Sequence, residues 1–334
     1  MHAGKQGSYV EEPMNNSCRS QFSMPLVSII MPTLNSGKYL PAALDSVKAQ
    51  TYTNIELIIV DGGSDDDTVE IAESHDGCRL LFNKDANLYA ALNDGISACS
   101  GDIVCFLNSD DLLGVTALQK IAEKFEKEKA AQIVCGNAML FEDNSSGSRI
   151  VIDDYRRYSG WEFDIETLLY GAPVINAHYF RKDVFNSAGY FDTSYSLAAD
   201  REFMLRCYAA GLRRYYINEL VYLYRQHPCS LTLNKEKSNA YIMGQEHLHI
   251  SSVLKDSRND ILRRHSSRAC DDASVSIMAA CVRDRQFLRL IDFCYRHFAK
   301  DPLFVLRVPG TVIRKLYRRI QVGRLRRLGK TAKQ

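Results

Sequence analysis

The chain has 334 residues, of which 46% are apolar and 25% charged, and its formal net charge is +2. This length and composition exclude a disordered or fibrous chain and allow one large domain, or one domain with a smaller extension. The charge is unevenly spread, because residues 302–334 hold ten Lys or Arg and no Asp or Glu, which leaves 32 basic and 40 acidic residues in 1–301.

Strand and helix patterns alternate from residue 26 to residue 129. Residues 1–23 before them show no periodicity and are predicted to be a flexible leader. Strands are predicted at 26–31, 55–60, 79–82 and 102–107, and helices at 36–50, 64–74, 89–98 and 116–129. Strands separated by helices imply right-handed crossovers, and therefore a mostly parallel sheet flanked by helices.

The pattern changes after residue 131. A strand is predicted at 131–141, and polar residues at 144–148 predict a hairpin between 139–142 and 149–153. An amphipathic helix at 199–210, which Gly211 would cap, precedes a Tyr-rich strand at 214–225. A helical pattern is predicted from residue 233 to the end. The predicted units are the leader 1–23, an α/β domain 24–232, a helical extension 233–305 and a basic amphipathic tail 306–334.

Two features indicate where the protein resides. The N-terminal residues lack the basic-then-apolar pattern of a secretory signal, and no apolar run approaches the length of a membrane span. The ten cysteines form no CxxC pair, and Cys105, Cys135 and Cys207 lie inside apolar segments. They are interpreted as reduced, buried side chains, which predicts a cytoplasmic protein.

Two polar runs, Asp61 to Asp65 and Asn108 to Asp111, directly follow two of the predicted strands. In a parallel sheet, residues just past the strand ends line the crevice where ligands bind. Carboxylates gathered there repel one another unless a cation, a ligand hydroxyl or a proton compensates. Each run alone is typical of a polar turn that caps the next helix. Two runs at matching positions favour a binding site.

The chain resembles the family 2 glycosyltransferases in segments that occur in the family's order. They are 25–35 (PLVSIIMPTLN), 46–52 (SVKAQTY), 58–64 (IIVDGGS), 87–96 (NLYAALNDGI), 101–102 (GD), 107–111 (LNSDD), 189–192 (GYFD) and 199–200 (AD). The match spans residues 25–230 and is closest to the bacterial branch that adds sugars to lipid-linked polysaccharide intermediates. It implies an α/β GT-A (Rossmann-like) fold and a nucleotide-sugar donor, most simply a UDP-sugar.

The resemblance assigns the donor site. Asp61 matches the family's nucleotide-binding acid, and Pro32, Thr33 and Asn35 would form the facing wall of the pocket. Asp110 and Asp111 match the motif that binds Mg²⁺ or Mn²⁺ against the diphosphate, where the cation stabilises the leaving group. Many family members have an acid at the position of Asn108. The amide can still bind a ribose hydroxyl or a metal-bound water, or it can simply cap a turn.

Asp200 is the predicted catalytic base, because it matches the acidic position that begins a helix in the family. A helix N-terminus favours an ionised carboxylate, and one such base with in-line displacement implies inversion at the anomeric carbon. Glu202 is the rival, and an ordinary N-cap role for Asp200 is the alternative. Weaker candidates for phosphate, acceptor or sugar contacts are Arg225, His227, Asn176, His178 and the tyrosines 215, 216, 222 and 224.

The tail has the pattern of an interfacial helix. Val312, Ile313, Leu316, Tyr317 and Ile320 share one face, and Arg314, Lys315, Arg318 and Arg319 the other. This pattern predicts peripheral binding to an anionic membrane, on the inner face of the cell membrane, with the basic side towards the lipid. The alternatives are a helix packed on the α/β domain or a tail that binds nucleic acid, which we do not expect.

Two other functions remain open from the sequence. A sugar nucleotidyltransferase would need a Gly-rich basic triphosphate loop, and residues 32–38 form a poor one. A catalytically silent nucleotide-sugar-binding scaffold would explain Asn108 as part of a decayed site. The sequence does not identify the donor sugar, the acceptor, the linkage or the oligomeric state.

Overall fold

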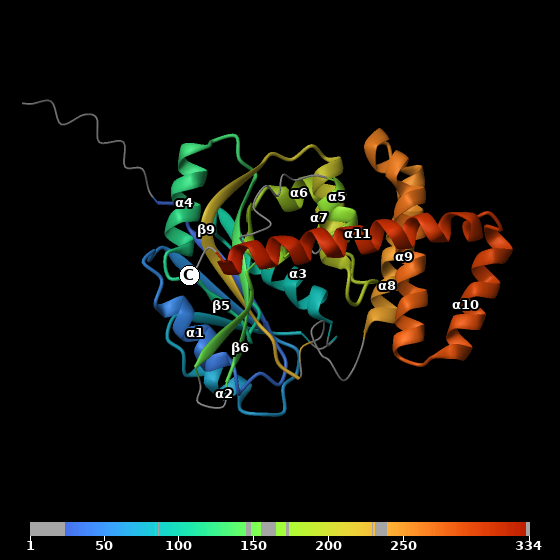
Figure 1. Cartoon of the computed structure of the whole chain (residues 1–334). Coiled ribbons are helices and arrows are strands. Elements are labelled where there is room, and N and C mark those ends of the chain that lie inside the picture. Colours follow the sequence, from blue (N-terminus) through green and yellow to red (C-terminus); the bar gives the residue numbers. More distant parts are fainter. Residues whose placement is uncertain are drawn as a thin grey trace, which may run out of the picture.

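The structure is a computed structural model that describes residues 24–83, 85, 87–144, 148–154, 165–171, 174–228, 230 and 239–331. Within these residues a nine-stranded sheet carries helices on both faces, and a group of helices follows it in the chain (Figure 1). The leader predicted at 1–23 lies outside the described residues.

The first half of the sheet is parallel, as the alternating pattern predicts. Strands β1 (Val27–Thr33), β2 (Ile55–Asp61), β3 (Cys78–Phe82) and β4 (Ile103–Phe106) lie in the order β3-β2-β1-β4. Helices α1 (Leu40–Lys48), α2 (Thr68–Glu73) and α3 (Leu88–Ala98) connect them, and α4 (Ala117–Lys127) follows. The first two helices begin later than predicted, because residues 34–39 and 62–67 form loops beyond the strand ends.

The central strands are buried on both faces, which explains their continuous apolar sequences. Ile30 on β1 belongs to a core that includes residues of α3 and α7. Ile29 and Met31 face the opposite core, beneath α1 and α4. Helix α3 lies close to β1 at Gly95, where an added Cβ would lie 2.3 Å from Cγ2 of Ile30.

The second half of the sheet is mixed. Strands β8 (His178–Arg181), β6 (Ile133–Asp143), β9 (Arg214–Arg225) and β5 (Leu112–Leu113) extend it beyond β4, and only β6 and β9 pair in parallel there. Strand β7 (Arg149–Asp154) pairs antiparallel with β6, which confirms the hairpin, and β9 has the predicted bounds. The intervening helices are α5 (Ile165–Tyr170), η2 (Ile175–Ala177), α6 (Val184–Ala188) and α7 (Ala199–Ala209).

The extension consists of α8 (Ala240–Val253), η3 (Leu254–Asp256), α9 (Asp260–Arg283), α10 (Phe287–Lys300) and α11 (Phe304–Thr331). Figure 1 shows α8, α9 and α10 beside the α/β domain and α11 returning across them. Helix α11 is continuous through the predicted tail boundary and through Gly323. No helix in the described part of the chain is long and apolar enough to cross a bilayer.

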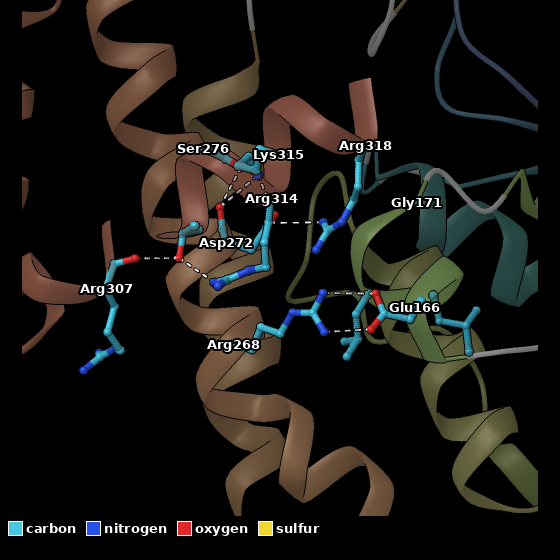
Figure 2. Close-up of polar contacts among 12 residues, drawn as sticks. Glu166, Gly171, Arg268, Asp272, Ser276, Arg307, Arg314, Lys315 and Arg318 are labelled. Carbon is cyan, nitrogen blue, oxygen red and sulfur yellow. Dashed lines mark hydrogen bonds and ion pairs between the residues drawn. The ribbon is translucent and has the colours of Figure 1, made fainter. Parts of the chain in front are cut away.

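Helix α11 packs against the protein with basic residues. Lys315 Nζ lies 2.5 Å from Asp272 Oδ2 on α9, and Arg318 lies 3.3 Å from the other oxygen (Figure 2). The guanidinium of Arg318 also covers the ring of Tyr170 on α5 at 4.2 Å. Of the basic face predicted to meet lipid, Lys315 and Arg318 therefore bind α9. The apolar face points outwards, with Ile313 65% exposed and Tyr317 61% exposed.

The cysteines agree with the interpretation from sequence. Those in the described residues are all free, and Cys105, Cys135 and Cys207 are buried. Burial raises the pKa of these three thiols. They therefore act as small core side chains.

Candidate functional site

The two polar runs meet at one edge of the sheet. The parallel register places Thr33 opposite Asp61, and the Thr33 hydroxyl donates to Asp61 Oδ2 at 3.1 Å. The hydroxyls of Ser36 and Ser109 are 2.7 Å apart, which joins the loop after β1 to the loop after β4. The predicted convergence of the strand ends is therefore present.

Asp61 organises the loop that follows β2. It is 1% exposed, and its Oδ1 accepts hydrogen bonds from the amides of Gly63 at 2.9 Å and Ser64 at 2.8 Å. The Ser64 hydroxyl donates to Oδ2 at 2.5 Å. Gly63 has a φ of 92°, a conformation that glycine adopts without strain. The carboxylate thus fixes the loop that would face a nucleotide base.

The residues predicted to form the facing wall lie at the end of β1 and in the loop after it. Pro32 and Thr33 are buried within β1. Asn35 is exposed, with a φ of 49°, and its Oδ1 accepts from the amide of Asp65 at 2.9 Å. The loops after β1 and β2 are therefore tied to each other.

The two adjacent carboxylates of the second run have different surroundings. Asp111 is fully buried, and its oxygens accept from the Arg225 amide at 2.7 Å and the Tyr222 hydroxyl at 2.5 Å. The amide of Asn108 donates to the same carboxylate at 3.1 Å. Burial first, and the charge of Asp110 second, raise the pKa of Asp111 well above its usual range. Asp111 and Asn108 therefore anchor β9 to this loop.

Asp110 is the outward member of the pair. Its side chain is 26% exposed, and Oδ2 lies 2.7 Å from Nε2 of His227. The ring of His227 packs against that of Tyr39 with 4.5 Å between centroids, and the Arg225 guanidinium lies 5.0 Å from the centroid of the Tyr39 ring. Arg225 Nε also donates to the backbone oxygen of Asp110 at 2.6 Å. Residues from three loops thus surround one partly exposed carboxylate.

These residues fit a divalent cation shared with a ligand. The described residues contain no cluster of three or more His, Cys, Asp or Glu side chains that could hold a metal. Asp110 and His227 provide two adjacent side chains that could act as metal ligands, and Nδ1 of His227 is buried without a hydrogen-bond partner. Mg²⁺ in phosphate-binding enzyme sites is held by one or two carboxylates plus phosphate oxygens, and Asp110 is such a carboxylate. The donor set therefore suits a cation whose other ligands come from a diphosphate.

Asp200 lies in the first turn of α7 and is partly buried. Its Oδ1 accepts from the Arg201 amide at 2.7 Å, and burial raises the pKa of this carboxyl from 3.8 to about 6. The Arg201 side chain turns away, donating to the backbone oxygens of Leu168, Leu169 and Gly171 at the end of α5. Asp200 thus remains available for chemistry.

The rival carboxylate is engaged elsewhere. Glu202 forms a bidentate ion pair with Arg206, with distances of 2.8 and 2.9 Å from Nε to its two oxygens. Arg206 in turn donates to the backbone oxygen of Tyr190 at 2.6 Å. This pair holds the 189–192 motif against α7, so Glu202 has a structural role.

Two family motifs position the approach to Asp200. The side chain of Asn93 on α3 exchanges hydrogen bonds with the Phe191 backbone, both 2.9 Å long. Asn87 caps α3 and donates to the Thr193 oxygen at 3.1 Å. These amides fix residues 191–193, which lead into α7. Helix η2 contacts α7 as well as β4 and β9, so it connects the helix of Asp200 to strands that carry the strand-end site.

The weaker candidates are mostly structural. His178 is buried, and burial lowers its pKa to about 3, so it stays neutral. Asn176 donates to the Tyr222 hydroxyl at 2.7 Å and thereby joins the Asp111 network. Arg225 is 4% exposed and also pairs with Asp143. Tyr39, which packs on His227, could not be identified from sequence, because its position before α1 is the only signal that the sequence gives for it.

Comparison with known proteins agrees with this geometry. Residues 28–186 match the model described as "Glycosyl transferase family 2". A PGL/p-HBAD biosynthesis glycosyltransferase of Mycobacterium tuberculosis is 32% identical over 192 residues, which are 55% of this chain and 70% of the relative. The uncharacterized glycosyltransferase EpsJ of Bacillus subtilis is 27% identical over 266 residues, 72% of this chain and 76% of EpsJ.

The structure is also similar to that of S. aureus TarS 1-349 in complex with UDP-GlcNAc. The TM-score is 0.57 at 17% identity, and the match covers 85% of this chain and 76% of TarS 1-349. This likeness confirms the α/β fold of the GT-A type with its helical extension. The chain belongs to glycosyl transferase family 2.

Proposed function

We propose that the protein is an inverting glycosyltransferase that moves a sugar from a UDP-sugar to a hydroxyl of a glycan or lipid-linked acceptor in surface polysaccharide synthesis. One arrangement carries this proposal: Asp200 is a partly buried carboxylate in the first turn of α7, the side chain of its neighbour Arg201 binds the backbone at the end of α5, and burial raises the pKa of Asp200 to about 6. Such a group is ionised near neutral pH yet basic enough to take the acceptor's proton.

The chemistry follows from a single base. Asp200 would accept the proton of the acceptor hydroxyl while that oxygen attacks the anomeric carbon from the face opposite the diphosphate. The other carboxylate on α7 is Glu202, and it is paired with Arg206. Since Asp200 is then the single carboxylate on this helix that is available for the reaction, we expect one displacement and inversion. The oxygen–glycosyl bond forms, the anomeric carbon–phosphate oxygen bond breaks, and the nucleoside diphosphate leaves.

The donor would bind between the loops after β1 and β2. Leu34 is 50% exposed on this wall, and Asn35 and Asp61 fix the two loops that would enclose the base. The structures of TarS with UDP and with UDP-GlcNAc support a uridine nucleotide for the fold, and we extend that choice to this chain.

We place Mg²⁺ or Mn²⁺ at Asp110 and His227, with Asp111 holding the loop from behind. The cation, when bound, would stabilise negative charge on the departing diphosphate. Calorimetric titration of Mn²⁺ in the presence of UDP should show weaker binding for Asp110→Asn and His227→Ala than for the wild type. Undiminished transfer in excess EDTA would contradict the cation's role.

The reaction is tested by screening UDP-, GDP- and TDP-sugars for slow donor hydrolysis, followed by transfer to candidate acceptors. Hydrolysis of a UDP-sugar that depends on Asp200 supports the proposal. UDP binding without any hydrolysis or transfer would indicate a silent scaffold. Release of pyrophosphate from UTP and a sugar phosphate would instead indicate a nucleotidyltransferase.

We further propose that the protein binds the cytoplasmic face of an anionic membrane through α10 and α11. On α10, large apolar residues are strongly exposed along one side: Phe287 57%, Leu288 85%, Ile291 66% and Tyr295 77%. Helix α11 adds Leu306, which is 77% exposed, together with the outward residues Ile313 and Tyr317. Aromatic and aliphatic side chains of this kind insert at a lipid interface.

The positive charge of residues 302–334 favours an anionic lipid surface as the partner of α10 and α11. Residues 302–334 have no acidic side chain, and each Lys or Arg near an anionic bilayer contributes on the order of 1 kcal/mol. Because Lys315 and Arg318 bind α9, we propose that apolar residues of α11 insert while other basic residues of 302–334 attract the headgroups.

Flotation with vesicles tests this location. Ile291→Asp combined with Ile313→Asp should release the protein from vesicles containing phosphatidylserine, and salt should weaken wild-type binding. Val115→Asp is the matched control, since Val115 is 57% exposed but lies before α4. Equal flotation of the double variant and the wild type would overturn the proposal. So would a wild type that forms dimers and binds no vesicles, if the double variant is a monomer.

A further inference from the structure

The segment that leads into the helix of Asp200 is held by a residue of the helical extension. Glu246 on α8 accepts four hydrogen bonds through its carboxylate. Its Oε1 accepts from the Ser196 amide at 2.8 Å and the Ser196 hydroxyl at 2.6 Å. Its Oε2 accepts from the amides of Leu197 at 2.9 Å and Ala198 at 2.8 Å.

This contact holds the entry to α7. Ala198 is the N-cap residue of the helix and has no side chain that could bond the first amides. Glu246, 48 residues further along the chain, binds the amide of Ala198 and the amides of the two residues before it. An anion near a helix N-terminus is also stabilised by the helix dipole. The segment from which α7 starts, two residues before Asp200, is therefore held by α8.

We propose that Glu246 is a positioning residue for the catalytic base, so that the helical extension is part of the active site and not only a support. The inference rests on the proposed role of Asp200. It deepens that role, because α3 holds residues 191–193 from one side and Glu246 holds residues 196–198 from the other.

The negative charge of Glu246 also affects the pKa of Asp200. The groups that face Asp200 are Arg201 on its own helix, Glu246 on α8 and Tyr89 on α3, whose phenol stays neutral because burial raises its pKa. Arg201 lowers the pKa of Asp200 and Glu246 raises it. Removing the negative charge at position 246 should therefore lower the pKa of the base.

The test compares Glu246→Gln, Glu246→Asp and the exposed neighbour variant Gln245→Ala in donor hydrolysis and transfer. An amide at position 246 keeps the size but presents an NH₂ group to backbone donors, so the segment 196–198 should shift. Displacement of a catalytic group by about 1 Å costs up to 10²-fold in rate. We expect kcat to fall about 10- to 100-fold in Glu246→Gln, with the donor KM within about twofold of wild type.

The pH profile separates positioning from loss of fold. In Glu246→Gln the acidic limb of kcat should move to lower pH, because the base loses a neighbouring negative charge. Glu246→Asp keeps the charge but is one methylene shorter, so its limb should stay in place while kcat falls. Gln245→Ala should match the wild type. Circular dichroism and UDP affinity verify that each variant is folded.

The outcomes distinguish this inference from the proposed function. If Asp200→Asn is inactive and folded Glu246→Gln keeps wild-type kcat and pH profile, the positioning role is wrong and the base assignment stands. If Asp200→Asn itself retains kcat, both the base assignment of Asp200 and the positioning role of Glu246 are wrong. Should Glu246→Gln not fold, Glu246→Asp and Ser196→Ala decide, and unchanged kcat in both overturns the inference.

Discussion

Asp200→Asn should make the protein less active and more stable at neutral pH. The variant keeps the shape of the side chain but cannot accept a proton, so kcat should fall by about 10²–10⁴-fold while UDP affinity changes little. Stability should rise because burial makes the ionised carboxylate unfavourable in the folded state. The ionised Asp200 carboxylate would therefore support catalysis while it lowers the free energy of unfolding.

The magnitude follows from the pKa. Burial raises the pKa of Asp200 from 3.8 to about 6, and two units correspond to about 3 kcal/mol if the whole shift is expressed. Partial exposure reduces this to roughly 1–3 kcal/mol. For a carboxyl whose folded pKa is raised, stability is fully present below pH 4 and is lost as the pH rises through 6. The advantage of the variant should therefore be absent at pH 4 and complete at pH 8.

The assay is denaturant unfolding of both proteins between pH 4 and pH 8, alongside kcat measured over the same range. Wild-type kcat should fall about tenfold per pH unit below pH 6. Glu202→Gln is the matched control. Because it breaks the ion pair with Arg206, it should lose about 0.5–1 kcal/mol and keep its activity. A variant Asp200→Asn that is no more stable than wild type at pH 8 would refute the burial argument.

Two further outcomes are expected from the packing around the site. Tyr222→Phe should cost about 1–3 kcal/mol in chemical denaturation, since it removes the hydroxyl bonded to Asp111. Gly95→Ala should lower the thermal midpoint at a cost of about 1–3 kcal/mol, because its Cβ would lie 2.3 Å from Ile30; an unchanged midpoint would show that α3 shifts freely.

The parallel half of the sheet could be predicted from sequence because its information is local. Each strand in β1 to β4 is a short apolar run followed by an amphipathic helix, and chain connectivity then dictates parallel neighbours. The same locality explains why the polar runs at Asp61 and Asp110 could be placed at one edge. Their position depends only on where β2 and β4, the two neighbours of β1, end.

The mixed half of the sheet could not be predicted in this way. Strands β6 and β9 are separated by the hairpin and several helices, and their parallel pairing depends on contacts far apart in sequence. The different roles of Asp110 and Asp111 have the same origin. Which of two adjacent carboxylates faces outwards is decided by Tyr222 and Arg225 on β9, more than 100 residues away.

The tail shows what an amphipathic pattern leaves undetermined. The sequence of α11 separates an apolar face from a basic face, and a helix on a soluble domain normally buries the apolar one. The choice depends on the partner surface, and α9 presents Asp271 and Asp272 to Arg307, Lys315 and Arg318. Since these ion pairs occupy basic residues, the apolar face is left outwards. Acidic residues on α9 thus create the apolar surface through which we propose that the enzyme reaches its membrane.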